Sequence, residues 1–135
     1  MTIHFGTDGW RAVISDTFTF SNLRMVSQAI ADAVASEHWD KSENVDEKKI
    51  VMGYDTRFLS DRFAGEVGRV LAANGFSVLL AQSDSPTPAI SYAVKNNNAI
   101  AGVMITASHN APRYNGVKLK GAFGGSALPE QCRRV

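Results

Sequence analysis

The sequence predicts an α/β fold, specifically a three-layer α/β/α domain with a mixed, mostly parallel sheet. Short runs of apolar and β-branched residues alternate with segments whose apolar residues recur at helical spacing. This alternation is typical of layered α/β domains. Crossovers that contain a helix join parallel strands, whereas the last two runs have no helix between them. The final strand is therefore expected to run antiparallel to its neighbour.

The first predicted elements are a short strand and a helix. Residues 12–15 form the strand, and Ser21 is the expected N-cap of a helix that runs to about His38. The buried face of this helix consists of four apolar residues at helical spacing: Leu23, Val26, Ile30 and Val34. Residues 39–49 mix opposite charges without periodicity and are predicted to form a solvated loop.

The middle of the chain is predicted to form a strand, a helix and a second strand. Residues 50–54 have the composition of a buried strand. Ser60 and Asp61 begin the helix, and residues 73–75, Ala-Asn-Gly, end it with a left-handed glycine. Residues 77–81 form the strand that follows.

The last predicted elements are a helix and two strands. The pair Thr87-Pro88 predicts a helix start in which the threonine caps, and the asparagine run at 96–98 ends the helix. Residues 100–105 form a buried strand. The pair Asn115-Gly116 favours a positive-φ turn, from which residues 117–120 return as a half-exposed strand.

Length and composition suit a single domain with its own core. Of the 135 residues, 44% are apolar and 20% are charged, so residues 1–135 are expected to fold as one unit. The net charge of +1 gives no reason to expect nucleic acid or a membrane as a partner. No signal-peptide pattern or long apolar run occurs, so we expect a cytoplasmic location. The one cysteine, Cys132, cannot form an internal disulfide and is not expected to be catalytic.

Polar side chains follow two of the predicted buried strands. Asp55 and Arg57 come after one, and Ser108, His109 and Asn110 come after another. Ligands of open α/β sheets gather beyond the carboxyl ends of the strands, so a serine there is placed for chemistry or for ligand contact. Two alternatives stay open: Asp55 and Arg57 as a surface ion pair, and the serine segment as a loop that caps its own backbone.

A glycine-rich segment, residues 5–11, precedes the first strand. Gly6 and Gly9 allow positive φ or close backbone approach, and N–H groups near them can line an anion. Arg11 carries a planar guanidinium that matches phosphate oxygens. The segment can also be an ordinary turn, and Lys118 can be an ordinary solvated lysine.

The motifs exclude several kinds of chemistry. Ser108 and His109 are adjacent, so their side chains diverge in an extended loop, and no G-x-S-x-G elbow surrounds the serine. A serine hydrolase is therefore not expected. The histidines show no metal-ligand spacing, and neither G-x-x-x-x-G-K-[ST] nor G-x-G-x-x-G occurs.

Four segments resemble motifs that occur together, in this order, in one enzyme family. They are FGTDGxR at 5–11, GxDTR at 53–57, PTPA within 85–89, and GGIMITASHNPxxYNGxK at 101–118. The chain is thereby similar to the α-D-phosphohexomutases, the phosphoglucomutase/phosphomannomutase family. It departs at Ala111, where the family usually has proline, and at Ala12, where glycine is common. Neither change removes a polar group, so a small effect on loop stiffness is expected.

The resemblance implies a phosphoryl-transfer mechanism. Ser108 would carry a phosphoryl group and exchange it with hexose 1- or 6-phosphates, of glucose or mannose, through a bisphosphate intermediate. Arg11 and Lys118 would stabilise the transferring group. His109 would move a proton or bind the sugar hydroxyl. The residues implied to bind phosphate or to brace the serine loop, with these two roles left open, are Thr7, Gly9, Asp55, Arg57 and Asn110.

The resemblance also implies what lies outside this chain. Family members are several times longer and have four domains, of which the chain resembles the first. Mg²⁺ would bind Ser108 through its phosphate, with the remaining ligands from the aspartate-rich loop of the absent second domain. The partners would be a hexose phosphate and the missing domains, and the isolated chain is expected to be inactive. The alternative is a non-catalytic module that binds phosphate or sugar phosphate.

Overall fold

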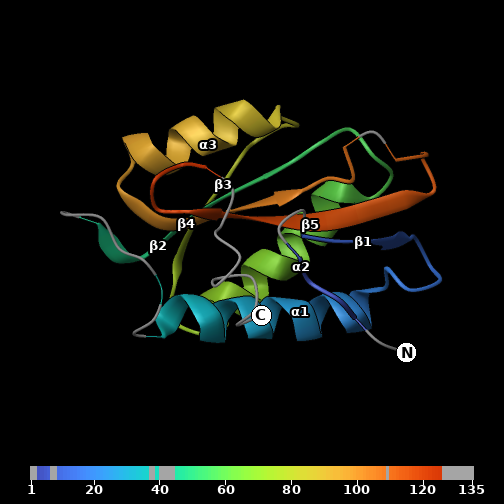
Figure 1. Cartoon of the computed structure of the whole chain (residues 1–135), viewed down its shortest axis with the longest axis horizontal. Coiled ribbons are helices and arrows are strands. Elements are labelled where there is room, and N and C mark those ends of the chain that lie inside the picture. Colours follow the sequence, from blue (N-terminus) through green and yellow to red (C-terminus); the bar gives the residue numbers. More distant parts are fainter. Residues whose placement is uncertain (1–2, 7–8, 37–38, 40–44, 109, 126–135) are drawn as a thin grey trace.

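Five strands and three helices make up the part of the chain that the computed structural model describes, residues 3–6, 9–36, 39, 45–108 and 110–125. The strands are β1 (Trp10–Val13), β2 (Asp46–Tyr54), β3 (Ser77–Leu80), β4 (Ala99–Ile105) and β5 (Tyr114–Gly121). The helices are α1 (Phe20–Ala35), α2 (Ser60–Ala73) and α3 (Thr87–Asn96). Figure 1 shows how they are arranged.

The strands form one sheet in the order β1-β5-β4-β2-β3. β2 is parallel to β3 and to β4, whereas β5 is antiparallel to both β4 and β1. Four of the described strands therefore point the same way and β5 opposes them. This confirms the mixed, mostly parallel sheet and the antiparallel final strand.

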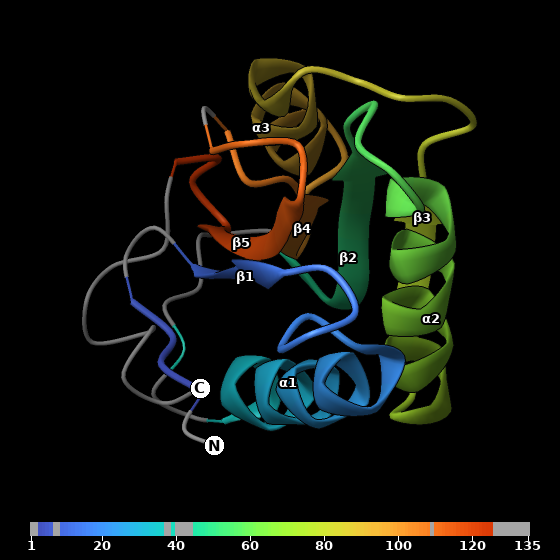
Figure 2. The ribbon, with the colours of Figure 1, turned by 90° about the vertical axis from the view of Figure 1, so that its right-hand side faces the viewer.

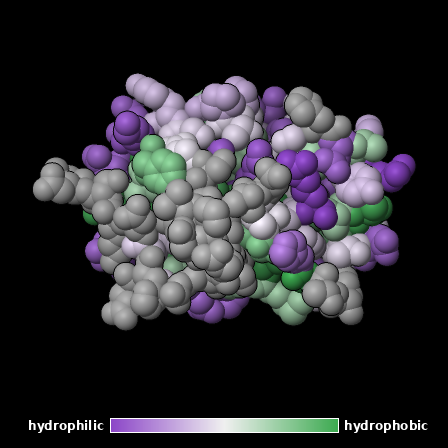
Figure 3. All heavy atoms as spheres, in the orientation of Figure 1, coloured by the Kyte–Doolittle hydropathy of each residue, from purple (hydrophilic) through white to green (hydrophobic). Residues whose placement is uncertain are grey.

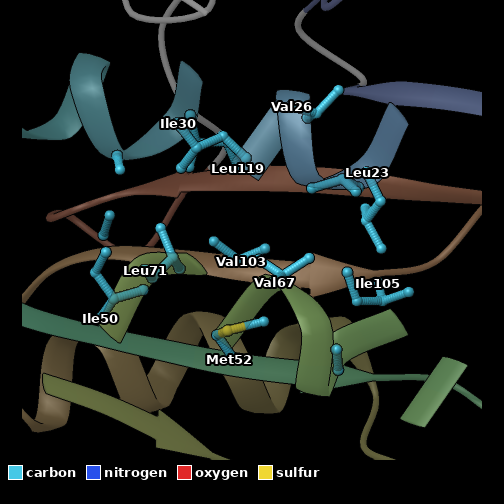
Figure 4. Close-up of a cluster of buried hydrophobic side chains, with 14 of the residues drawn as sticks. Leu23, Val26, Ile30, Ile50, Met52, Val67, Leu71, Val103, Ile105 and Leu119 are labelled. Carbon is cyan, nitrogen blue, oxygen red and sulfur yellow. The ribbon is translucent and has the colours of Figure 1, made fainter. Parts of the chain in front are cut away.

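Helices cover both faces of the sheet, which makes three layers. Figure 2 shows α3 on one side of the sheet and α1 on the other. Side chains of α1 and α2 share one core with the sheet, and a smaller cluster lies beneath α3. Figure 4 labels ten residues of the larger core: Leu23, Val26, Ile30, Ile50, Met52, Val67, Leu71, Val103, Ile105 and Leu119. Each such aliphatic side chain stabilises the fold by about 1.5–3 kcal/mol when it is fully buried.

The first helix begins earlier than the capping pattern predicts. Thr19, not Ser21, is the N-cap, and its hydroxyl accepts from the N–H of Asn22 at 3.2 Å. The cause is tertiary: Phe18 is fully buried and stacks on Trp10 at 4.7 Å between ring centroids, so the chain enters the helix directly after it. The helix ends at Ala35, before the predicted end at His38, which lies outside the described residues.

Two further boundary predictions are wrong in detail. The first strand covers Trp10–Val13 rather than residues 12–15, because Ser15 has a φ of 68° and lies in a turn. In α3 the N-cap is Pro86, so Thr87 is already helical and makes no capping bond. The end of α2 is as predicted, with Gly75 at a φ of 92°.

The solvated loop predicted for residues 39–49 is wrong at both of its ends. β2 begins at Asp46, whose N–H donates to the oxygen of Asn98 at 2.8 Å. The first residues of this strand are exposed, so no apolar pattern marks them. Trp39 is 3% exposed, and its indole N–H donates to the oxygen of Ile100 at 3.0 Å. An indole that is satisfied in this way belongs to the core.

The turn predicted at Asn115-Gly116 is also wrong, because both residues lie inside β5 and neither has a positive φ. Glycine is needed at position 116 for space. A Cβ there would lie 2.5 Å from the oxygen of Trp10 and 2.8 Å from that of Thr106. The chain turns earlier, where the N–H of Tyr114 donates to the oxygen of Ala111 at 2.9 Å.

The surface has mixed polarity. On the face that Figure 3 shows, hydrophilic and hydrophobic residues are interspersed among the atoms of the described residues. The large apolar residues that are exposed come from several elements: Met25, Phe58, Leu79, Leu80, Tyr92 and Phe123. Within the described ranges, no helix combines the length and the apolar character that crossing a membrane requires.

Candidate functional site

Ser108 lies in the loop after β4, which we call the serine loop (residues 106–113, of which 109 lies outside the described residues). The residue is exposed, so it is presented at the rim of the sheet, as predicted. Its φ of 52° places a non-glycine residue in the left-handed region, a conformation that costs free energy and persists only where surrounding contacts hold it. One of these contacts is its own N–H, which donates to Oγ1 of Thr106 at 3.0 Å.

Arg57 supplies most of the other contacts to the serine loop. Its two terminal nitrogens donate to four main-chain oxygens: Nη1 to Ala111 at 2.8 Å and Tyr114 at 3.0 Å, and Nη2 to Ser108 and Asn110, each at 2.7 Å. The side chain of Arg57 is only 11% exposed. Charged donors make stronger hydrogen bonds than neutral ones. The geometry therefore favours bracing of the loop over direct phosphate contact for this residue.

Asp55 orients this guanidinium. Its Oδ1 accepts from the N–H of Arg57 at 3.0 Å and from the hydroxyl of Ser60 at 2.9 Å, and its Oδ2 lies 3.4 Å from Nε of Arg57. The Ser60 oxygen in turn accepts from Nδ2 of Asn115 at 2.9 Å. The two residues are therefore not a loose surface ion pair but one part of a hydrogen-bonded network.

Sequence reasoning missed Ser60 and Asn115 as parts of the site. Ser60 was predicted only as a helix start and Asn115 only as a turn residue. The alternation along β5 was the available signal. It places Asn115 on the sheet face of Val117 and Leu119, which are core residues, and a buried amide there needs a partner.

Arg11 reaches the serine loop from β1. It pairs with Gly116 across the two strands, and its Nη1 donates to Oδ1 of Asn110 at 2.8 Å. A Cβ at Gly116 would lie 2.9 Å from Cγ of Arg11, so the glycine leaves room for this side chain. The Nε atom of Arg11 is buried and has no hydrogen-bond partner among the described residues. Arg11 also lines a pocket of about 450 Å³, together with His4 and Tyr114.

The glycine-rich segment packs against β5. Gly9 has a φ of 79°, and a Cβ there would lie 1.9 Å from the oxygen of Val117, so both properties expected of this glycine are present. Gly6 does not have a positive φ. The N–H groups of Gly6 and Gly9 donate to each other's oxygens at 3.1 and 2.9 Å, so these two groups do not line an anion. Thr7 lies outside the described residues.

Lys118 is half-buried on β5, on the same face of the sheet as Arg11. This follows from the register, because Arg11 pairs with Gly116 and side chains alternate along a strand. Lys120 lies on that face too and is 6% exposed. Burial, and after it the charge of Lys118, lowers the pKa of Lys120. Arg11, Lys118 and Lys120 thus share one face of the sheet, but Lys120 pairs with Gly102 and lies farther from the serine loop than Arg11 and Lys118 do. His109 lies outside the described residues.

The described residues do not by themselves provide a magnesium site. Among them, no group of three or more His, Cys, Asp or Glu side chains is arranged to hold a metal ion. The site does contain one carboxylate, that of Asp55. Its two oxygens face Arg57 and Ser60. An exposed oxygen on Ser108 would be a single ligand, whereas magnesium takes six.

Comparison with known families gives a match over nearly the whole chain. The family described as phosphoglucomutase/phosphomannomutase, alpha/beta/alpha domain I, matches residues 2–135. A phosphoglucomutase of Staphylococcus saprophyticus is 38% identical over 133 residues, which is 98% of this chain and 23% of that protein. A phosphoglucomutase of Staphylococcus haemolyticus is 42% identical over 101 residues, 75% of this chain and 18% of that protein. The chain thus spans about a quarter or less of the length of these relatives.

Solved structures agree with this comparison. A structure described as a phosphomannomutase from Thermus thermophilus superposes with a TM-score of 0.90 at 39% identity, covering 99% of this chain and 29% of that one. The phosphoglucomutase parafusin from Paramecium gives a TM-score of 0.81 at 25% identity, covering 97% of this chain and 24% of that one.

Proposed function

This chain belongs to the phosphoglucomutase/phosphomannomutase family, in which it matches domain I, and from that premise we propose that Ser108 is the phosphoryl carrier of a hexose-phosphate mutase. One observation carries the proposal. Ser108 is exposed at the carboxyl end of β4, in a left-handed conformation held by Arg57, with the guanidinium of Arg11 bonded to the next described residue of the same loop. A nucleophile that is held rigidly beside a cation suits a reaction that depends on position and charge.

The proposed reaction has two transfers. In the first, the P–O bond to Ser108 breaks, a P–O bond to the free hydroxyl of a hexose 1- or 6-phosphate forms, and the proton of that hydroxyl passes, in net terms, to the oxygen of Ser108. The product is a bound glucose or mannose bisphosphate and an unmodified serine. The bisphosphate then turns around, the P–O bond to its other phosphoryl group breaks, and that group bonds to the oxygen of Ser108, while the hydroxyl proton of Ser108 passes to the released sugar oxygen. The net result is isomerisation, with the enzyme phosphorylated again.

The cationic residues have distinct proposed roles. Arg11 has a buried Nε–H without a partner among the described residues, and an anion at the site would satisfy this donor. Lys118 contributes charge from the same face of the sheet. His109 is proposed to move the proton of the sugar hydroxyl or to bind that hydroxyl. Thr7 is proposed to lie beside the phosphate, whereas Gly9, whose N–H donates to the oxygen of Gly6, is proposed to hold the segment against β5.

The remaining residues hold the loop. Asn110 joins the two arginines, because its Oδ1 accepts from Arg11 and its main-chain oxygen accepts from Arg57. Asp55 keeps Arg57 in place. Bound magnesium would offset the charge of the phosphate on Ser108, with its other ligands supplied from outside this chain.

We propose that residues 1–135 act as one domain of a longer cytoplasmic enzyme. The length of the relatives, of which this chain covers 23% in one case, supports this, and the isolated chain would then be inactive. A second candidate is a free-standing module that binds phosphate or sugar phosphate. The Nε–H of Arg11, which has no partner among the described residues, favours this second candidate, because a phosphate could bind to that donor without a metal ion.

A chimera tests the mutase function. The chain would replace the matching segment of the Thermus thermophilus relative, and mutase turnover would be compared between Ser108 and Ser108→Ala forms. Turnover that depends on the serine, with a phosphate on Ser108 detected by intact mass, is the expected result. Near-normal turnover of the Ser108→Ala form would defeat the proposal.

A further inference from the structure

We propose that a polar relay, made of the buried residues Asn115 and Ser60 and the partly exposed Asp55, positions the serine loop through Arg57. The inference rests on the proposed function for its catalytic consequence, but the geometry can be tested without any reaction. It assigns Ser60 and Asn115 as positioning residues, which act through Arg57 and touch neither Ser108 nor a substrate.

The carboxylate of Asp55, at one end of the relay, fixes which group donates in each of its hydrogen bonds. An ionised carboxylate only accepts, so the hydroxyl of Ser60 must donate to Asp55. The Ser60 oxygen then accepts from Nδ2 of Asn115, and Oδ1 of Asn115 accepts from the N–H of Gly116. Each link therefore depends on the one before it, and a change at Asn115 or Ser60 alters the contacts of the carboxylate that orients Arg57.

The relay joins elements that meet at one point of the fold. Asp55 follows β2, Ser60 is the first residue of α2, and Asn115 lies near the start of β5. Ser60 is 1% exposed and Asn115 is not exposed at all. Because water cannot replace a partner at such positions, the loss of one link leaves a buried polar group unsatisfied. The serine loop is thus tied to the rigid centre of the molecule.

Backbone strain occurs beside the central member of the relay and at the residue that Arg57 holds. Leu59, directly before Ser60, has a φ of 61°, and Ser108, which Arg57 holds, has a φ of 52°. Leu59 is the N-cap of α2 but makes no side-chain capping bond. Strained conformations of this kind persist where hydrogen bonds over-determine them. At Ser108 those bonds come from Thr106 and from Arg57, whose guanidinium the relay orients, so the shape of the serine loop depends on the relay through Arg57.

Amide hydrogen exchange of the 135-residue chain tests the relay. The reporters are three amides in and directly after the loop that are hydrogen-bonded in the structure, those of Ser108, Asn110 and Tyr114. Ser60→Ala is expected to speed their exchange roughly tenfold or more, because local opening of the loop becomes easier. Ser27→Ala is the matched control. Ser27 is equally buried, but its hydroxyl donates to the oxygen of Leu23 within α1.

A double-mutant cycle separates positioning from general destabilisation. If the relay acts through Arg57, Ser60→Ala should raise the exchange rate of the loop amides only slightly in a chain that already carries Arg57→Lys, because that change removes the guanidinium that holds the loop. Ser60→Thr, which keeps the hydroxyl, should restore much of the loop protection. If Ser60→Ala does not fold, Asn115→Ala carries the same cycle, because it removes the donor to Ser60.

The outcomes are decisive in both directions. Loop exchange that rises no more in Ser60→Ala than in Ser27→Ala would overturn the relay, and so would full additivity with Arg57→Lys. Neither result bears on whether Ser108 accepts a phosphoryl group. Conversely, an unphosphorylated Ser108 in an inactive chimera would defeat the proposed function and leave the relay standing. In an active chimera, Ser60→Ala should lower kcat severalfold with little change in KM, since the relay contacts no substrate.

Discussion

Nη2 of Arg57 donates to the main-chain oxygen of Ser108 at 2.7 Å, across a sequence separation of 51 residues. The contact joins the residues that follow β2 to those that follow β4, two neighbouring strands whose carboxyl ends meet at one rim. Because the same guanidinium also binds the oxygen of Asn110, one side chain determines the path of the loop on both sides of position 109.

Replacement of Ser108 by alanine in the chimera is expected to abolish turnover, because no covalent carrier remains. Steady-state mutase assays and intact mass would measure the effect. Ser21→Ala, an exposed serine on α1, is the control and should leave turnover unchanged. A chimera that folds but shows no turnover with Ser108 intact would also count against the proposed function.

Replacement of Ser108 by glycine tests the backbone strain at this position. Glycine adopts a φ of 52° without steric cost, so Ser108→Gly should be more stable than Ser108→Ala by about 1 kcal/mol. Met25, which is 56% exposed inside α1, supplies a control of opposite sign when it is replaced by glycine and by alanine, since glycine inside a helix is about 0.5–1 kcal/mol less stable than alanine. Equal stabilities of the two Ser108 variants in urea unfolding would mean that the left-handed conformation carries no strain.

Arg57→Lys should destabilise the chain by about 1–3 kcal/mol although the charge is kept, because a lysine cannot reproduce a planar fork that binds four oxygens. Urea unfolding measures this change. Arg69→Lys, at an arginine whose side chain is 76% exposed, should stay within about 0.5 kcal/mol of the parent chain. If both variants behave alike, the fork at Arg57 does not hold the loop.

Arg11→Ala should weaken the binding of inorganic phosphate to the 135-residue chain at least severalfold, because the unpaired Nε–H is lost. Calorimetric titration would measure this, with Arg24→Ala as the control, since that side chain is 55% exposed on α1. Phosphate binding that depends on Arg11 but not on added magnesium would favour the binding module. Undiminished affinity would remove Arg11 from the anion site.

The titration of Lys120 should make the free energy of unfolding increase as the pH rises. Burial lowers its pKa in the folded chain below the ordinary 10.5, so the unfolded chain binds more protons between the two values. The free energy of unfolding attributable to Lys120 therefore increases as pH rises through that window. Lys120→Met should flatten this part of the stability profile, as measured by urea unfolding at a series of pH values. An unchanged profile would show that the lysine is not desolvated.

The sequence predicted the order of the elements and the rim position of Ser108 because both depend on local patterns. Residues 50–54 and 100–105 are almost wholly apolar, which marks buried strands, and Gly75 marks a helix end. Errors occurred where a distant contact outweighed the local pattern. The buried indole of Trp39 donates a hydrogen bond to the oxygen of Ile100. Polar Asp46 lies in a strand because its N–H donates to the oxygen of Asn98.

The sequence alone thus predicted an α/β sheet with Arg57 and Ser108 beyond the ends of two of its strands, because periodicity and turn residues are local features of the chain. Only the tertiary structure decided that Arg57 binds the serine loop, and that Asn115 and Ser60, 55 residues apart, meet behind it. The physical reason is that a donor's partner depends on which strands become neighbours. The packing of the whole molecule determines which strands are neighbours, and the residues on either side of the donor do not.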